Sequence, residues 1–290
     1  MKIAVVTDSS CDVNKATIEK YNIRVIPLQV VYKDKSYRDG IEINTDLIMQ
    51  NIDEEIPKTS LPLHSDVCNL MEKLKEENYT HILFILISSG LSGTYNMVKS
   101  AVEPYRTDFT IELIDSKMLS RCLGSAVIEA AKMAKITEDF QKSVDRAKEV
   151  LSNTIGFFTV DTLKYLKKGG RISRFEGGLA SVLDIRPIIG INEDGAYYPA
   201  AKVRGRNKSL KTMFDLVEKY VKGKEKVSVV VVQAGALEEA EELVRKFKNM
   251  VNVVFTHIEL LSPTLSIHVG AGGIGITAWW ENKFFKKTSS

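Results

Sequence analysis

The sequence predicts an α/β protein made of two α/β domains, with largely parallel sheets flanked by helices. Short apolar runs, such as residues 82–87, are followed by small or polar residues and then by a helical pattern, which is typical of buried parallel strands. Strand and helix patterns alternate through the first half of the chain, and the alternation starts again near Gly156. We therefore expect an N-terminal domain over residues 1–155, a C-terminal domain over residues 156–280 and a basic tail over residues 281–290.

In the N-terminal half, the order of elements predicts a doubly wound sheet. A proline on each side of residues 58–61 holds that segment extended or turned, so we expect a stiff loop there. Ser65 and Thr137 are placed as helix caps. The predicted strands are 3–7, 25–32, 82–87 and 109–116, and the predicted helices are 13–21, 65–78, 95–102, 119–134 and 137–151.

In the C-terminal half, Asp194-Gly195 is a hairpin signal between two strands. A basic glycine turn at residues 167–174 precedes the hairpin, and a helix ending at residues 181–183 lies between them. The other predicted elements are strands at 156–163, 185–191, 196–203, 227–236, 251–260 and 274–280, with helices from about 209 and over 237–248.

Composition limits the classes of function. The chain has 290 residues, is 44% hydrophobic and 27% charged, and carries a formal net charge of +3. This balance is ordinary for a globular protein, and no basic stripe interleaved with aromatics points to nucleic acid. The apolar runs are too short to span a membrane or to form a signal peptide. Three widely spaced cysteines fit no metal pattern, so we expect a cytoplasmic protein without a metal or a cofactor.

The stretch around Ser92 is the first candidate site. Ser88, Ser89, Gly90, Ser92 and Gly93 follow the buried strand and precede a helix. A turn of this kind presents backbone N–H groups and hydroxyls at a helix N-terminus, which favours an anion. The same residues also suit a plain helix cap, and the local sequence leaves both interpretations open.

Other candidates lie at element boundaries. Ser9 and Ser10 follow the first strand, where open sheets place ligands, whereas Asp12 is better explained as a cap. Thr59 and Ser60 lie on the proline-bounded loop. Arg171 and Arg204 each neighbour a glycine, and His268 lies where apolar Ile267 gives way to glycines. Together with the neutral donors, these three side chains suit the carboxylate or phosphate of an anionic ligand.

Two further patterns in the sequence resemble motifs of enzymes. The spacing of Gly270, Gly272 and Gly275 matches a dinucleotide fingerprint, but too little chain follows for the required helix and strand. Ser92, Asp115 and His268 occur in the order of an α/β-hydrolase triad, although the Gly-x-Ser-x-Gly elbow is absent around Ser92. A serine hydrolase or acyltransferase acting on a lipid therefore stays as an alternative.

Six motifs, in this order, resemble the bacterial DegV family over residues 3–278. They are TDSSCDV, PKTSLP, SSGLSGTY, KKGGRIS, KVRGRNKS and HVGAGG. The resemblance implies an EDD-type fold that encloses a long-chain fatty acid as its ligand, with the carboxylate near the interdomain cleft. It also implies a carrier that is not itself an enzyme. Such a carrier presents the carboxylate to a separate fatty-acid kinase, which makes the acyl phosphate used in phospholipid synthesis.

Carried over by motif, the carboxylate-binding positions are Thr59 with Ser60, Ser92 with Gly93, and His268. The positions facing the kinase or the phosphoryl group are Arg171 and Arg204. The chain departs from the family pattern at Leu61, Leu63, Ala271 and Cys11, none of which removes a donor. A small-anion sensor without an acyl pocket is the remaining alternative.

Overall fold

The computed structural model describes residues 1–172 and 185–281. Two short 3-10 helices, η1 (Ser9–Cys11) and η2 (Glu103–Thr107), accompany the regular elements. The strands are β1 (Ile3–Asp8), β2 (Arg24–Ile26), β3 (Gln29–Val31), β4 (Ser36–Arg38), β5 (Lys58–Ser60), β6 (His81–Leu86), β7 (Thr110–Asp115), β8 (Thr154–Thr159), β9 (Ile185–Ile191), β10 (Tyr197–Arg204), β11 (Glu225–Ala234), β12 (Val253–Leu260) and β13 (Gly273–Glu281). The helices are α1 (Lys15–Tyr21), α2 (Thr45–Asn51), α3 (His64–Glu76), α4 (Thr94–Val102), α5 (Ser120–Thr137), α6 (Phe140–Ser152), α7 (Lys164–Gly169), α8 (Arg206–Val221), α9 (Leu237–Lys248) and α10 (Pro263–Val269).

The first sheet is parallel, as the sequence predicts. Its order is β2-β1-β6-β7, and every neighbouring pair runs in the same direction. The apolar run of β6 is buried on both faces because helices cover both sides of the sheet. Phe84 packs with residues of α3 and α4, whereas Leu83 and Ile85 pack with residues of α5 and α6.

The second sheet is mixed. Its order is β10-β9-β8-β13-β11-β12, and only the β11–β12 pair is parallel. The expectation of largely parallel sheets thus fits the first sheet and is wrong in detail for the second. The reason is connectivity, because β9 and β10 form a hairpin through Gly195 and β13 inserts between β8 and β11.

A third, small antiparallel sheet was not predicted. Its order is β4-β3-β5. The segment 25–32, expected to be one strand, is divided between β2 of the first sheet and β3 of this one, because Pro27 cannot continue a strand ladder. The proline-bounded segment expected to be a loop is β5, with Thr59 paired to Val30.

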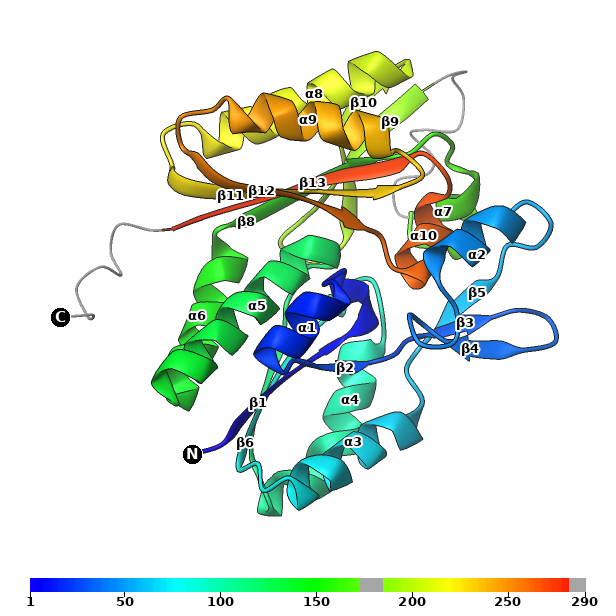
Figure 1. Cartoon of the computed structure of the whole chain (residues 1–290). Helices are drawn as coiled ribbons and strands as arrows, with labels where there is room; N and C mark the ends of the chain where they lie inside the picture. Colours follow the sequence, from blue (N-terminus) through cyan, green and yellow to red (C-terminus); the bar gives the residue numbers. More distant parts are fainter. Residues whose placement is uncertain (173–184, 282–290) are drawn as a thin grey trace.

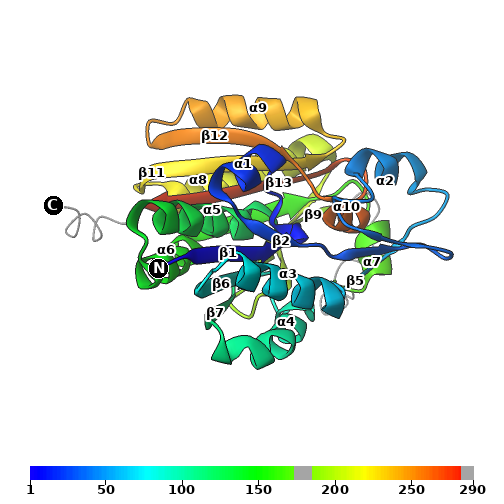
Figure 2. The ribbon, with the colours of Figure 1, turned by 60° about the horizontal axis from the view of Figure 1, so that its bottom comes forward.

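The large sheets share a layer of helices. α5 packs against β1 and β6 of the first sheet and against β8, β11 and β13 of the second. The outer face of the second sheet is covered by α8 and α9, and the outer face of the first by α3 and α4 (Figures 1 and 2). One core cluster therefore runs from Val5 of β1 through α5 to Val230 of β11.

Helix starts differ slightly from the predicted caps. Leu63 is the N-cap of α3, and His64, rather than Ser65, is its first residue. The N-cap of α6 is Asp139, whose side chain accepts a hydrogen bond from Lys142 N, while Thr137 ends α5. The helix end expected at residues 181–183 and most of the expected tail lie outside the described residues. The two-domain division stays a prediction; β8 starts at Thr154, beside the expected boundary.

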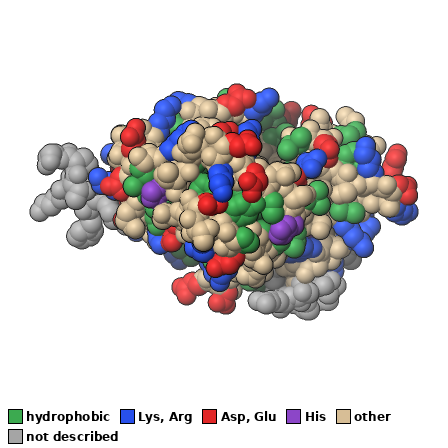
Figure 3. All heavy atoms as spheres, turned by 90° about the horizontal axis from the view of Figure 1, so that it is seen from below, with side chains coloured by type: hydrophobic (Ala, Val, Ile, Leu, Met, Phe, Trp, Pro, Cys, Tyr) green, Lys and Arg blue, Asp and Glu red, His purple; other side chains and the backbone are tan. Residues whose placement is uncertain are grey.

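The surface carries no single-sign patch on the face seen in Figure 3, where basic and acidic side chains are interspersed. Within the described residues, no helix is both long and apolar enough to cross a membrane.

Candidate functional site

A polar pocket forms where β5, the β6–α4 turn, α7 and α10 meet. Of the carboxylate-binding and kinase-facing residues that the family resemblance implies, all except Arg204 line it. They come from segments far apart in the sequence: Thr59, Ser60, Ser92, Gly93, Arg171 and His268. The pocket has a volume of about 710 Å³, part of it open to solvent, and apolar side chains such as Leu28 and Ile87 complete its wall.

Thr59 and His268 form the innermost polar pair. Thr59 Oγ1 lies 3.0 Å from His268 Nε2, and this hydrogen bond joins β5 to α10. Burial, followed by the charge of Arg171, lowers the pKa of His268 to about 4. The ring is therefore neutral at pH 7 and has one N–H group and one bare nitrogen.

The other ring nitrogen of His268, Nδ1, is buried and has no hydrogen-bond partner in the described part of the chain. It faces Gly169, where a Cβ atom would lie 2.3 Å from Nδ1. A bare acceptor is less costly to bury than an unpaired N–H, so the proton belongs on Nε2. His268 then donates to Thr59, which leaves the Thr59 hydroxyl hydrogen free for a ligand.

Ser92 and Gly93 lie at the start of α4. Gly93 is the N-cap residue, which corrects the suggestion that Ser92 is the cap. Ser92 Oγ lies 2.8 Å from Thr94 Oγ1 and accepts a hydrogen bond from Thr94 N at 3.3 Å. Either hydroxyl of the Ser92–Thr94 pair can be the donor. When Thr94 donates, the Ser92 hydroxyl hydrogen can point to a ligand at the positive end of the helix dipole.

The two predicted arginines occupy different places. Arg171 follows the end of α7, donates to the Gly169 carbonyl and lines the polar pocket. Gly170 precedes it as the left-handed cap of α7, with φ +73°. Arg204 ends β10, is exposed and does not line the pocket. Arg171 therefore contributes charge to the pocket, whereas Arg204 lies outside it.

Buried acids hold α10 in place. Asp12 accepts from Ser262 N at 2.7 Å and from Ser120 Oγ, and Asp39 accepts from Thr264 N at 3.2 Å. Burial raises the pKa of Asp12 to about 7 and that of Asp39 to about 6. These contacts fix the start of the helix that carries His268.

Ser9 and Ser10 do not act as the pocket ligands that the sequence suggested. Ser9 Oγ donates to Asp39 at 2.6 Å and accepts from Leu28 N, while Ser10 Oγ donates to Asp8 at 2.5 Å. Neither residue lines the polar pocket. Ser9 and Ser10 therefore bond buried acids next to the site and do not line the polar pocket themselves.

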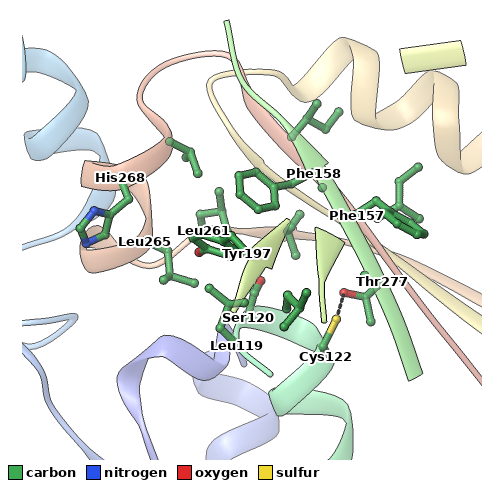
Figure 4. Close-up of a pocket in the computed structure, with 17 residues that line it drawn as sticks. Leu119, Ser120, Cys122, Phe157, Phe158, Tyr197, Leu261, Leu265, His268 and Thr277 are labelled. Carbon is green, nitrogen blue, oxygen red and sulfur yellow. Dashed lines mark hydrogen bonds between the residues drawn. The ribbon is translucent and has the colours of Figure 1, made fainter. Parts of the chain in front are cut away.

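An apolar cavity lies beside the polar pocket, and its volume of about 560 Å³ includes space open to solvent. Leu119, Tyr197, Leu265 and His268 line both spaces, so the two are adjacent. Figure 4 shows His268 at one end of the cavity and the Cys122–Thr277 pair at the other, with Phe158 between them. Cys122 Sγ lies 3.2 Å from Thr277 Oγ1, and burial raises the pKa of Cys122 to about 11, so its thiol is neutral.

The residues between the polar pocket and the apolar cavity were not predicted from the sequence. Tyr197 looks like an ordinary strand residue after a hairpin turn, yet its ring packs on Phe158 with centroids 5.2 Å apart, between the two spaces. Leu119 and Leu265 look like helix-core residues. No local signal marks them, because the cavity exists only after the second sheet has packed on α5.

The departures from the family pattern leave the donors in place. Leu61 lines the polar pocket, about 3.4 Å from the position of a Cβ at Gly93. Leu63 is exposed at the start of α3, and Cys11 is buried against Gly124. Ala271 lies between Gly270 and Gly272, whose positive φ angles shape the turn after α10.

The geometry does not assemble a hydrolase triad. Asp115 bonds Ser89 and pairs with Lys117 at 2.8 Å, and His268 bonds Thr59. Within residues 1–172 and 185–281, no carboxylate orients His268 and no cluster of His, Cys, Asp or Glu could hold a metal ion. Ser92 therefore lacks the base–acid pair that would activate it as a nucleophile.

The DegV family, described as a family of uncharacterised proteins, matches residues 2–281. A DegV domain-containing protein from Clostridium perfringens is 35% identical over 276 residues, which cover 95% of this chain and 98% of the relative.

Solved structures show the same architecture. A fatty acid binding DegV protein from Bacillus subtilis is 26% identical and superimposes with a TM-score of 0.87, covering 97% of this chain and all (100%) of the other. A stearic acid-binding protein from Eubacterium ventriosum is also 26% identical, with a TM-score of 0.87 and coverage of 97% and 98%. The α/β fold with helix-flanked sheets is therefore common to this chain and these proteins.

Proposed function

The chain belongs to the DegV family, and on that premise we propose that it is a carrier that binds a long-chain fatty acid and presents its carboxylate to a separate fatty-acid kinase. The acyl chain occupies the apolar cavity, and the carboxylate lies in the polar pocket. The relatives from Bacillus subtilis and Eubacterium ventriosum, described as binding fatty acid and stearic acid, support this ligand class.

The observation that carries the proposal is the junction of the two spaces. A fatty acid has one polar end and one long apolar end, and the walls change from polar to apolar across the residues that both spaces share. Burying the chain contributes ~0.8 kcal/mol per methylene, which is enough to supply most of the affinity.

The carboxylate is held mainly by neutral donors. The Thr59 and Ser92 hydroxyls and the start of α4 at Gly93 provide hydrogen bonds, while Arg171 adds one charge beside the pocket. Neutral donors position an anion without the strong attraction of a buried bidentate arginine pair. This arrangement suits a carrier, because the carboxylate has to be positioned and also released.

The partner is proposed from the family resemblance and from the position of Arg204. This exposed residue lies outside the polar pocket, next to Gly205 at the start of α8. An exposed cation can attract the acidic surface or the phosphate of a partner. In this proposal Arg204 acts in docking, and Arg171 acts on the carboxylate or the phosphoryl group.

The ligand is tested by mass spectrometry of the molecules that co-purify with the protein. The proposal predicts long-chain fatty acids in about stoichiometric amount. A small polar anion without an acyl chain would instead support the sensor alternative, and labelling of Ser92 by a serine-hydrolase probe would revive the hydrolase.

The partner is tested with Arg204→Glu and with Arg245→Glu, a matched reversal on the exposed side of α9. We expect Arg204→Glu to abolish acyl-phosphate formation with a fatty-acid kinase while leaving fatty-acid binding intact. Arg245→Glu should leave both unchanged. Equal loss of binding and phosphorylation in Arg204→Glu would contradict the docking role.

A further inference from the structure

Arg121 is a buried cation that the carrier function does not use. It lies in the first turn of α5, between Ser120 and Cys122, which line the apolar cavity, but Arg121 itself lines a different groove. Only 6% of its surface is exposed. Burial lowers the pKa of Arg121 from its ordinary value, which reflects the cost of holding this charge away from water.

The guanidinium has no hydrogen bond or ion pair within the described residues, and its Nε is buried without a partner. Glu259 and Asp12 act on its charge without forming an ion pair with it. Glu259 Oε2 instead accepts from Asn14 Nδ2 at 2.9 Å and lies 3.5 Å from His257 Nε2. An uncompensated buried charge is costly, so an arginine in this state needs a counter-ion.

A second polar atom without a partner lies beside it. Ser125 is one helical turn after Arg121, only 3% exposed, and its Oγ has no partner in the part of the chain that the structure describes. Residues four apart on a helix are neighbours on one face. Arg121 and Ser125 therefore lie on the same face of α5, and both line the groove.

The Arg121 groove is a built space between α1, α5 and the β11–β12 side of the second sheet, elements that lie together in Figure 2. It holds about 1330 Å³, part of it open to solvent. Tyr21, Phe255 and Trp279 give it an aromatic wall.

The acids that line the Arg121 groove already have partners. Glu129 pairs with Lys132 and Arg146 at 2.7 and 2.8 Å, and Glu281 pairs with Lys226 at 2.9 Å. Lys20 also lines the groove and forms no ion pair within the described residues. The groove therefore has an excess of unpaired positive charge.

We propose that the Arg121 groove is a second ligand site, which binds a small organic oxyanion with an aromatic or apolar body. The oxyanion, a carboxylate or a phosphate ester, pairs with Arg121 and Ser125, and the body lies against the aromatic wall. The planar guanidinium of an arginine can donate two parallel hydrogen bonds to a carboxylate or to a phosphate. An ion pair that is buried from solvent is stronger than an exposed one. The site is separated from the apolar cavity by the first turn of α5.

The test uses the full chain saturated with a long-chain fatty acid, so that the polar pocket is occupied. Benzoate, phenyl phosphate and inorganic phosphate are titrated by calorimetry at low ionic strength. We expect saturable one-to-one binding of benzoate, of phenyl phosphate or of both. Inorganic phosphate should bind more weakly, because it has no ring to pack against the aromatic side chains of the groove. The ring-bearing probe that binds more tightly identifies the oxyanion.

Two variants decide the role of Arg121. Arg121→Met should weaken binding about tenfold or more, whereas Arg245→Met, a matched loss of an exposed arginine, should leave it unchanged. Ser125→Asp supplies an internal carboxylate at the same point. It should raise Tm and abolish probe binding, so it remains informative even if Arg121→Met does not fold.

Absence of saturable binding would overturn the proposal and would mean that Glu259 and solvent satisfy Arg121. Binding that is unchanged in folded Arg121→Met or Ser125→Asp would overturn it as well. Inorganic phosphate binding as tightly as phenyl phosphate would overturn the role of the aromatic wall.

Discussion

The polar pocket and the apolar cavity are neighbours built in opposite ways. The pocket is assembled from the ends of short elements, and its side chains already have local partners, such as Thr94 for Ser92 and His268 for Thr59. The cavity is walled by strands of the second sheet and by α5, with few polar atoms. We propose that the apolar cavity supplies most of the affinity for the fatty acid and that the polar pocket positions its carboxylate. Substitutions in the cavity should therefore weaken fatty-acid binding more than substitutions in the pocket.

The largest effect is expected from closing the junction. Leu265→Trp enlarges a side chain that lines both spaces. If the larger ring excludes about four methylenes from the cavity, binding falls by ~3 kcal/mol, which is about 100-fold. Titration with a fluorescent long-chain fatty acid measures the change.

Leu237→Trp is the matched control, because Leu237 is exposed at the start of α9. It should bind the fatty acid as the native chain does. If Leu265→Trp folds normally and binds with unchanged affinity, the acyl chain does not cross this junction.

A smaller effect is expected in the polar pocket. Thr59→Val keeps the side-chain shape and removes the hydroxyl that bonds His268. One hydrogen bond contributes about 0.5–1.5 kcal/mol, so binding should weaken by about tenfold at most. The same titration, with Thr110→Val at the exposed start of β7 as control, provides the comparison. A loss as large as that of Leu265→Trp would show that the head group, rather than the chain, dominates affinity.

The smallest effect is a pH dependence set by His268. Its pKa of about 4 is below the ordinary 6.5, so the unfolded chain binds an extra proton between these values. The folded state therefore loses stability as pH falls through this window. The free energy of unfolding of the native chain, minus that of His268→Gln, should be constant above pH 6.5 and fall toward pH 4. The raised pKa values of Asp12 and Asp39 act in the opposite direction, but they are present in both chains and cancel in the difference.

The pKa of His268 should also change when the fatty acid binds. A bound carboxylate next to Thr59 and His268 favours the protonated ring, so fatty acid should raise the pKa of His268. NMR titration of the ring protons with and without ligand measures this shift. An unchanged pKa would place the carboxylate away from His268.

The sequence is informative where a function depends on contiguous residues. The strand–turn–helix around Ser92 is visible because the apolar run, the small residues and the helix follow one another, and β6 and α4 form there. The motif around Arg171 likewise predicts a glycine turn, and Gly169 makes room for His268.

Features built from distant segments could not be predicted in this way. The apolar cavity takes residues from β8, β9, β10, β11, β13, α5 and α10, and most of them resemble ordinary core residues. The mixed order of the second sheet depends on β13 inserting between β8 and β11, which no local pattern shows. In the sequence Arg121 is one charge within a helical segment, and only the structure shows that it is buried with its Nε unpartnered.

The most direct test is a crystal structure of the protein with a long-chain fatty acid. Our account predicts carboxylate oxygens within hydrogen-bond distance of Thr59 Oγ1 and Ser92 Oγ, with the acyl chain passing between Tyr197 and Leu265 into the apolar cavity. A carboxylate bound elsewhere, or a chain lying in any other space, would contradict it.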